Sequence, residues 1–215
     1  MDARPNRNHT GGTPARRPRP RLPGFAALLV AASLAVPAAA QEITDDLLAE
    51  FRALVAKPVV LIAVRAQNER HKTLDQAAID ALDTRWRQEV KAADQPLIAQ
   101  LMGSPLSNHL IKVKAESSGL ITEVFVTDNR GLNVGQSSIT SDYWQGDEPK
   151  FQKTFLVGPD AVNRAAVEVD PKTGTRRQQI DFTVVDPDTG KPVGAVTFEV
   201  DLDELAERLA KRAKS

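Results

Sequence analysis

The feature that most constrains the fold is a change in hydrophobic period at Ser118-Gly119. Before this point, apolar residues recur at steps of three and four, as they do along an amphipathic helix. After it, short stretches that alternate apolar and polar residues are separated by turns rich in Gly, Asp and Pro, which is typical of antiparallel strands. A helical first half and a strand-rich second half predict an α+β domain built on one antiparallel sheet.

The first half begins with two longer helical patterns. The apolar positions of Ile43–Ala66 predict one long amphipathic helix, and Pro58 should kink it. Thr73 and Gln76 have the spacing of a capping box, which predicts a second helix over residues 74–92.

Two shorter helices are expected next. Asp94 and Pro96 start one that stops at Gly103. Ser104-Pro105 then supplies an N-cap residue followed by proline at the first helical position, so another helix should start there.

The second half predicts a hairpin followed by a three-stranded meander. Two turns of the form Asp-Pro-x-Thr-Gly, at 170–174 and 186–190, separate the meander strands. A helical insertion is expected around 143–155, and a final helix over 202–211. The predicted strands are residues 120–127, 132–136, 162–169, 176–185 and 193–200.

The first 40 residues have the features of a cleavable signal peptide. Six arginines and one acidic residue precede a short apolar stretch, Phe25–Val36, and Ala38-Ala39-Ala40 provides the small residues of a cleavage site. We expect cleavage after Ala40, a periplasmic location, and a single domain over residues 41–215.

Charge and composition exclude several function classes. The chain has 28 basic and 28 acidic residues. Six basic residues and one acidic residue precede Gln41, so residues 41–215 hold 22 basic and 27 acidic residues and carry a formal charge of −5. We therefore expect no nucleic-acid partner, because phosphate binding depends on clustered Lys and Arg. The chain has no cysteine, which excludes thiol catalysis, thiolate metal sites and disulfides.

The last two predicted strands each have one apolar and one polar face. Asp181 and Thr183 lie on the polar face of one strand, and Thr197 and Glu199 on that of its neighbour. This face is either solvated or covered by the segment 142–155 to enclose a small pocket. The composition of that segment favours the pocket, because it combines Tyr143-Trp144 with both signs of charge. Phe151 and Phe155, four residues apart, are expected to be core contacts.

The sequence resembles a known family, the periplasmic PAS-like sensor modules called Cache or PDC domains, and in particular the stand-alone exported kind. The similarity is carried by the N-terminal helix, the hairpin at 127–131, the run 141–155 and the closing stretch 184–196. It implies a five-stranded antiparallel sheet with the long helix on one face and a small-molecule pocket on the other. The ligand-binding residues that it implies are Tyr143, Trp144, Asp147, Lys150, Lys153 and Asp181.

The resemblance also bears on the ligand and the partners. In such a module Tyr143 and Trp144 would form the wall of the pocket. Lys150 and Lys153 could bind a carboxylate group of the ligand, and Asp181 could bind an amine group. The Arg-Trp-Tyr pattern of the amino-acid-binding members is absent around Tyr143, so an amino-acid ligand is not implied. We expect a small carboxylate or amine as ligand, a separate membrane receptor or transporter as partner, and a homodimer through the long helix as a further option.

Two other functions are alternatives to a sensor. A hydrolytic enzyme is disfavoured because the only histidines after residue 40, His71 and His109, are better explained as surface or packing residues, and no nucleophile elbow or zinc-protease motif occurs. We expect no catalytic residue, no metal and no cofactor. The second alternative is a protein interaction module that docks through the helix 43–66 or a sheet edge and has no ligand.

Overall fold

The computed structural model describes residues 43–214, so the predicted signal peptide lies outside the described part. None of the helices in residues 43–214 is long and apolar enough to cross a membrane. The helices are α1 (Asp45–Val55), α2 (Pro58–Arg70), α3 (Gln76–Glu89), α4 (Pro96–Met102), α5 (Pro105–Glu116), α6 (Pro149–Gln152) and α7 (Leu202–Arg212). The strands are β1 (Ile121–Thr127), β2 (Asn133–Gln136), β3 (Val162–Arg164), β4 (Glu168–Val169), β5 (Arg176–Val185) and β6 (Pro192–Asp201).

The strands form one antiparallel sheet in the order β2-β1-β6-β5-β3, with β4 also paired to β5. The predicted α+β class, the hairpin and the antiparallel meander are therefore confirmed. The expected strand 162–169 differs, because it is divided into β3 and the two-residue β4, which pair with different parts of β5.

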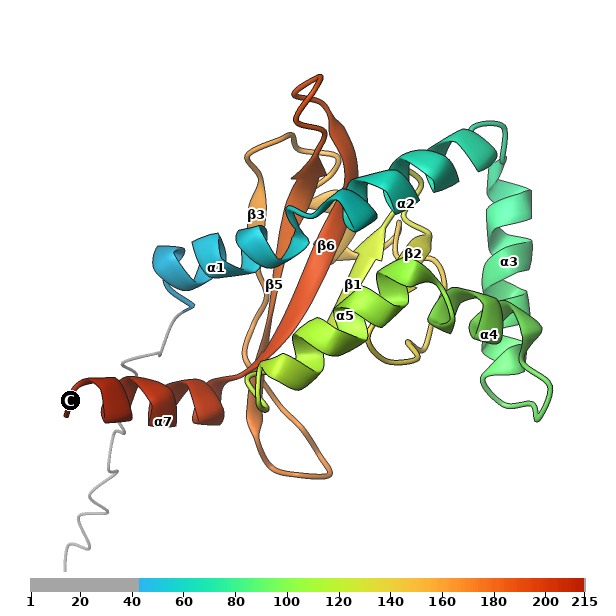
Figure 1. Cartoon of the computed structure of the whole chain (residues 1–215). Helices are drawn as coiled ribbons and strands as arrows, with labels where there is room; N and C mark the ends of the chain where they lie inside the picture. Colours follow the sequence, from blue (N-terminus) through green and yellow to red (C-terminus); the bar gives the residue numbers. More distant parts are fainter. Residues whose placement is uncertain (1–42, 215) are drawn as a thin grey trace, which may run out of the picture. The chain divides into compact units, whose positions relative to one another are not determined.

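One face of the sheet carries the main hydrophobic core. Figure 1 shows α1, α2 and α5 lying across this face. Phe51 of α1 stacks on Phe198 of β6 with ring centres 4.5 Å apart, and Phe198 in turn lies 6.0 Å from Phe182 of β5. The alternation read from the sequence is thus confirmed for the apolar side of these strands.

The N-terminal helical segment differs from its prediction. Instead of one kinked helix over 43–66, α1 ends at Val55 and α2 begins at Pro58. Lys57 between them is extended, with φ −119° and ψ 146°. The physical reason is that proline disfavours a helical conformation in the residue before it, while its own φ suits the first position of a new helix.

The other helix boundaries follow capping chemistry. The predicted cap of the second helix is wrong: Asp75, not Thr73, is the N-cap of α3, and its carboxylate accepts the amide hydrogen of Ala78 at 2.9 Å. The boundaries at Gly103 and Ser104 are confirmed, since Gly103 ends α4 and Ser104 Oγ accepts from Ser107 N at the start of α5.

A second hydrophobic cluster lies where α3 and α4 pack together beside β2. At its centre Trp86 is fully buried and stacks on Tyr143 with ring centres 5.3 Å apart. The Trp86 indole nitrogen donates to the carbonyl oxygen of Thr140 at 2.9 Å. This cluster therefore fixes the loop that follows β2.

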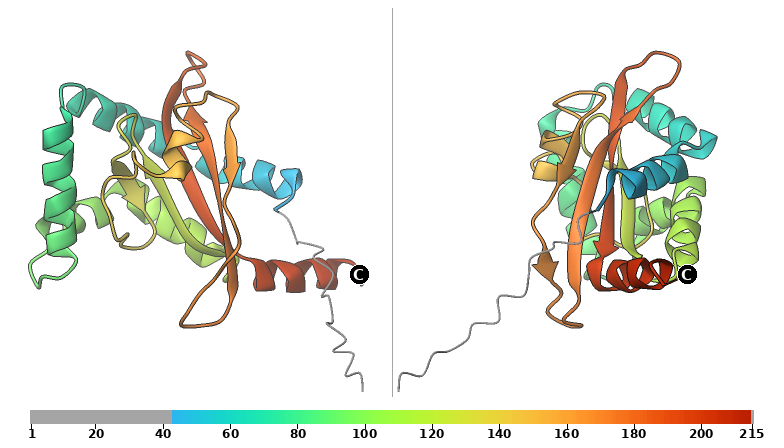
Figure 2. Two further views of the ribbon diagram at one scale, coloured as in Figure 1. Left: turned by 180° about the vertical axis from the view of Figure 1, so that it is seen from behind. Right: turned by 90° about the vertical axis from the view of Figure 1, so that its left-hand side faces the viewer.

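The chain between β2 and β3, residues 137–161, covers the second face of the sheet. Figure 2 shows α6, within this segment, on the side of the sheet away from α1 and α2. We call this segment the covering segment. The predicted helix around 143–155 is reduced to the single turn of α6, while Phe151 is buried as expected and stacks on Phe155 at 5.0 Å. Of the two states weighed for the polar face, solvated or covered, the structure has the covered one.

Candidate functional site

The covered face of the sheet is lined by polar residues in cross-strand rows. The pairing of the strands places Asn163, Asp181, Thr197, Phe125 and Gln136 in one continuous row from β3 to β2. Side chains at such paired positions lie side by side on one face of a sheet. The row thus brings a buried carboxylate into the centre of the covered face.

Asp181 is the most unusual member of this row. It is 0% exposed, and its Oδ2 accepts a hydrogen bond from Asn163 Nδ2 at 2.7 Å. Its other oxygen, Oδ1, is buried without a hydrogen-bond partner among the described residues. Burial raises the pKa of Asp181, against the opposing effects of Asn163, Thr197 and Lys150. A buried oxygen that lacks a donor is costly and suggests a group that the protein alone does not supply.

The neighbouring row adds two more carboxylates. Glu123 of β1 and Gln179 of β5 both pair with Glu199 of β6. Burial, and then the negative charge of Glu199, raise the pKa of Glu123 to about 7. Glu199 is itself held by the Thr122 hydroxyl, which donates to Oε1 at 2.6 Å.

Lys150 reaches this face from the covering segment. It follows Pro149, which occupies the first position of α6. Its Nζ lies 5.4 Å from the centre of the Phe125 ring and 2.8 Å from Glu148 Oε2, and it donates to Gln145 Oε1 at 3.3 Å. The side chain is only 16% exposed.

A cavity of about 210 Å³ lies beside Lys150 and Glu199. One of its walls is Arg177, which forms ion pairs with Asp170 at 2.8 Å and Glu199 at 3.2 Å. Arg177 Nε is also buried without a hydrogen-bond partner among residues 43–214. Asp181 and Glu123 lie on the same face of the sheet but do not line this cavity. We call the cavity with its lining residues Glu199, Lys150 and Arg177, together with Asp181 and Glu123, the sheet-face site.

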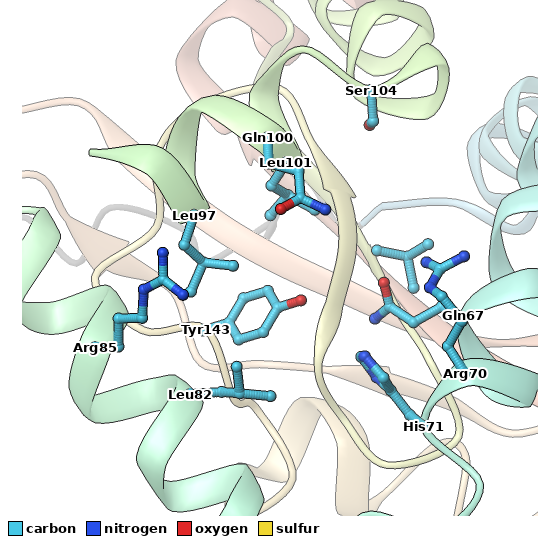
Figure 3. A pocket seen from close by; sticks show the side chains of 11 residues that line it. Gln67, Arg70, His71, Leu82, Arg85, Leu97, Gln100, Leu101, Ser104 and Tyr143 are labelled. Carbon is cyan, nitrogen blue, oxygen red and sulfur yellow. The ribbon is translucent and has the colours of Figure 1, made fainter. Parts of the chain in front are cut away.

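A second cavity of about 310 Å³ lies among the helices (Figure 3). It is bounded by the end of α2, by α3 and α4, and by Tyr143 of the covering segment. We call it the helical cavity. Its lining residues are Gln67, Arg70, His71, Leu82, Arg85, Leu97, Gln100, Leu101, Ser104, Val134 and Tyr143.

The structure does not bring the six predicted ligand-binding residues into one pocket. Lys150 and Asp181 belong to the sheet-face site, whereas Tyr143 lines the helical cavity and is 5% exposed. Trp144 is half-buried, and its indole nitrogen donates to the carbonyl oxygen of Arg130 at 2.8 Å. Asp147 and Lys153 are exposed. Tyr143 and Trp144 lie near the helices because Asp83 of α3 accepts their amide hydrogens, at 2.9 and 3.0 Å.

Three residues of the sheet-face site are absent from the predicted set: Glu123, Glu199 and Arg177. The alternation of residues 120–127 places Glu123 and Phe125 on one side of a strand, and the alternation of 193–200 does the same for Glu199. These patterns indicate the face but not which strands are neighbours. The alternation of 176–185 likewise places Arg177 on the same side as Asp181, but its ion pairs with Glu199 and Asp170 depend on contacts that local sequence does not show.

Glu123→Gln is expected to change how stability depends on pH. Because the folded-state pKa of Glu123 is about 7 and its ordinary value is 4.5, the folded protein loses stability as pH rises through this window. Glu123 should contribute about 2 to 3 kcal/mol to this loss in the wild type, and the variant should lack that contribution. Urea unfolding at pH 5 and pH 8 measures it, with the exposed Glu50→Gln as control. Equal pH dependence in Glu123→Gln and wild type would contradict the assignment.

The two histidines that the enzyme alternative needs lie outside the sheet-face site. His71 Nδ1 lies 2.9 Å from Asp128 Oδ2, and His109 Nε2 lies 3.0 Å from the carbonyl oxygen of Leu54. Within residues 43–214, no group of three His, Asp or Glu side chains is placed to hold a metal ion.

No protein-family profile and no curated protein matches the chain. Solved structures do. The extracellular domain of the histidine kinase vpHK1S-Z8 is 12% identical with a TM-score of 0.46, and the match covers 78% of this chain and 55% of that one. The sensor domain of the Vibrio cholerae histidine kinase DctB is 14% identical with a TM-score of 0.34, covering 74% and 57%. The ligand-binding domain of the Pseudomonas aeruginosa amino acid chemoreceptor PctC, in complex with GABA, is 15% identical with a TM-score of 0.38, covering 75% and 62%.

These three structures are an extracellular domain and a sensor domain of histidine kinases and the ligand-binding domain of a chemoreceptor. The chain spans 55 to 62% of their length.

Proposed function

We propose that this protein is a non-catalytic sensor domain that binds a small amine at the sheet-face site. The observation that carries the proposal is the buried Asp181 carboxylate, one oxygen of which has no donor among the described residues. An ammonium group is a donor that would satisfy this oxygen and also neutralise its charge.

The balance of charge around the site favours an amine over a carboxylate. Asp181, Glu123, Glu199, Glu148 and Glu168 supply acidic groups, while the basic side chains are Lys150, Arg177 and Lys114. Lys150 pairs with Glu148 and Arg177 with Glu199, and Lys114 donates to the Ser138 hydroxyl at 2.7 Å. A cationic ligand would therefore gain from the excess of acid, whereas an anionic ligand would have to displace existing ion pairs.

The cellular role follows from the predicted signal peptide. We propose that the domain acts outside the cytoplasm, and that ligand binding alters a surface that docks on a separate membrane receptor or transporter. The predicted amine-binding residue Asp181 keeps its role in this proposal, whereas Lys150, which was expected to meet a carboxylate ligand, pairs with Glu148. Trp144, Asp147 and Lys153 have no direct role in it.

The test is thermal unfolding of the purified protein with a panel of small amines and, for comparison, small carboxylates. An amine at one hundred times its dissociation constant should stabilise the fold by about 2.7 kcal/mol, which is a shift of several degrees. Asp181→Asn should remove the shift. The ligand-free variant should be at least as stable as the ligand-free wild type, because the substitution removes a buried carboxyl group whose pKa is raised by burial. Asp160→Asn, an exposed position in the covering segment, is the matched control.

Two results would contradict the proposal. One is a shift from an amine that Asp181→Asn leaves unchanged. The other is the absence of any shift across a broad amine panel, which would favour the docking module instead.

A further inference from the structure

We infer that the helical cavity is a second binding site, and that it takes a small monocarboxylate with an apolar body. This inference does not depend on the sheet-face site. The cavity holds about 310 Å³, the lower end of the range for small-molecule sites, so its ligand must be compact.

The charged side chains that line this cavity are basic. Arg70 lies at the end of α2 and Arg85 on α3, and no carboxylate lines the cavity with them. The Arg70 side chain makes no hydrogen bond or ion pair with any residue of the described range 43–214. An arginine guanidinium suits a carboxylate because it can donate two parallel hydrogen bonds.

Tyr143 supplies a further donor. Its hydroxyl points into the cavity, toward the space between Gln67 and Gln100 (Figure 3). Within residues 43–214 this hydroxyl has no hydrogen-bond partner. The ring behind it is held by stacking on Trp86, so the donor is fixed in place without a ligand.

The carboxylates behind the cavity wall cannot take the place of a ligand, because their oxygens are already occupied. Asp128 is fully buried and accepts from Gln67 Nε2 at 3.0 Å and from the amides of Arg130 and Leu132 at 2.8 and 2.9 Å, in addition to its contact with His71.

Glu89 is occupied in the same way. It accepts from the amides of Leu97 and Ile98, at 2.7 and 3.0 Å, and from Arg85 Nε at 2.8 Å. The cavity thus presents two arginines and the Tyr143 hydroxyl, while the carboxylates behind its wall are already hydrogen-bonded, and this arrangement favours an anion.

The rest of the wall is apolar and defines the body of the ligand. Leu82, Leu97 and Leu101 lie around the Tyr143 ring in Figure 3, and Val134 of β2 completes this surface. A ligand with a carboxylate at one end and an aromatic ring or branched alkyl group at the other matches both parts. An anion without an apolar body would match only the basic side chains, and a cation would not match them at all.

The probes are benzoate and isovalerate, with benzylamine as the cation of matched shape, measured by isothermal titration calorimetry on the purified protein. Either carboxylate should bind at millimolar concentration or below, and benzylamine should not bind in this cavity. Arg70→Ala should weaken carboxylate binding at least tenfold, and Tyr143→Phe by several-fold, since it removes the hydroxyl but keeps the stacked ring.

Controls separate this site from the sheet-face site. Lys91→Ala removes an exposed positive charge after α3 and should leave benzoate affinity unchanged, and so should Asp181→Asn. If Asp181→Asn abolished benzoate binding while Arg70→Ala did not, the carboxylate site would lie elsewhere and the inference would fail. Binding of neither carboxylate by a correctly folded wild type would also overturn it.

Discussion

Replacing Trp86 with alanine is expected to lower the free energy of unfolding by about 3 to 5 kcal/mol, the range for removing a large aromatic side chain from a core. Trp86 is 0% exposed, stacks on Tyr143 and donates its indole N–H to the carbonyl of Thr140. The variant loses the packing centre of the second cluster and leaves that carbonyl without its donor. Thermal unfolding followed by circular dichroism should show a midpoint lower by roughly 10 °C.

Trp86→Phe is the matched control. It keeps an aromatic ring against Tyr143 but removes the indole N–H, so the loss should fall to about 1 to 3 kcal/mol. If Trp86→Ala cost no more than Trp86→Phe, packing at this position would not hold the covering segment in place. A second readout is benzoate binding, which the alanine variant should also lose because Tyr143 would no longer be fixed.

Asp128→Ala is expected to have an effect of similar size, about 3 to 5 kcal/mol. The buried carboxylate of Asp128 accepts from two backbone amides of the β1–β2 hairpin, Arg130 and Leu132, and contacts the side chains of Gln67 and His71. Without it, several donors are buried with no acceptor, at a cost of about 1 to 3 kcal/mol for each. Urea unfolding gives the stability, and hydrogen exchange at the Leu132 amide reports the hairpin directly.

Asp128→Asn tests how the carboxylate acts. An asparagine side chain keeps one acceptor oxygen for the two hairpin amides but places an NH₂ group toward Gln67 and His71. We expect a smaller loss of stability than in the alanine variant, together with faster hydrogen exchange at the end of α2. An alanine variant as stable as wild type would mean that Asp128 does not join α2 to the hairpin.

The sequence by itself determined the class of fold and most of its elements. The change of period at Ser118-Gly119 separates the helices from the strands, and local chemistry sets several boundaries directly. Ser104 with Pro105 starts α5, Gly103 ends α4, and the alternation along β5 separates Ile180 from Asp181. These features depend on residues close together in the chain, so periodicity and capping rules are sufficient to find them.

Sequence reasoning also indicated that the covering segment and the polar sheet face belong together, and it named Lys150 and Asp181. It expected Tyr143 in the pocket on the sheet face, whereas Tyr143 lines the helical cavity. The covering segment carries aromatic and charged residues that could contact either the sheet or the helices. Asp83, sixty residues earlier in the chain, directs Tyr143 to the helices because its carboxylate accepts the amide hydrogens of Tyr143 and Trp144.

The tertiary structure alone decided how the strands are ordered and which carboxylates meet. β1 lies beside β6, and this approach requires Gly194, because a side chain there would come within 2.0 Å of the carbonyl oxygen of Thr127. The same pairing places Glu123 next to Glu199, which helps to raise the pKa of Glu123 to about 7. Local sequence patterns define the faces of strands and helices, whereas the partner of each face is fixed by contacts between distant residues, and both candidate sites are formed by such contacts.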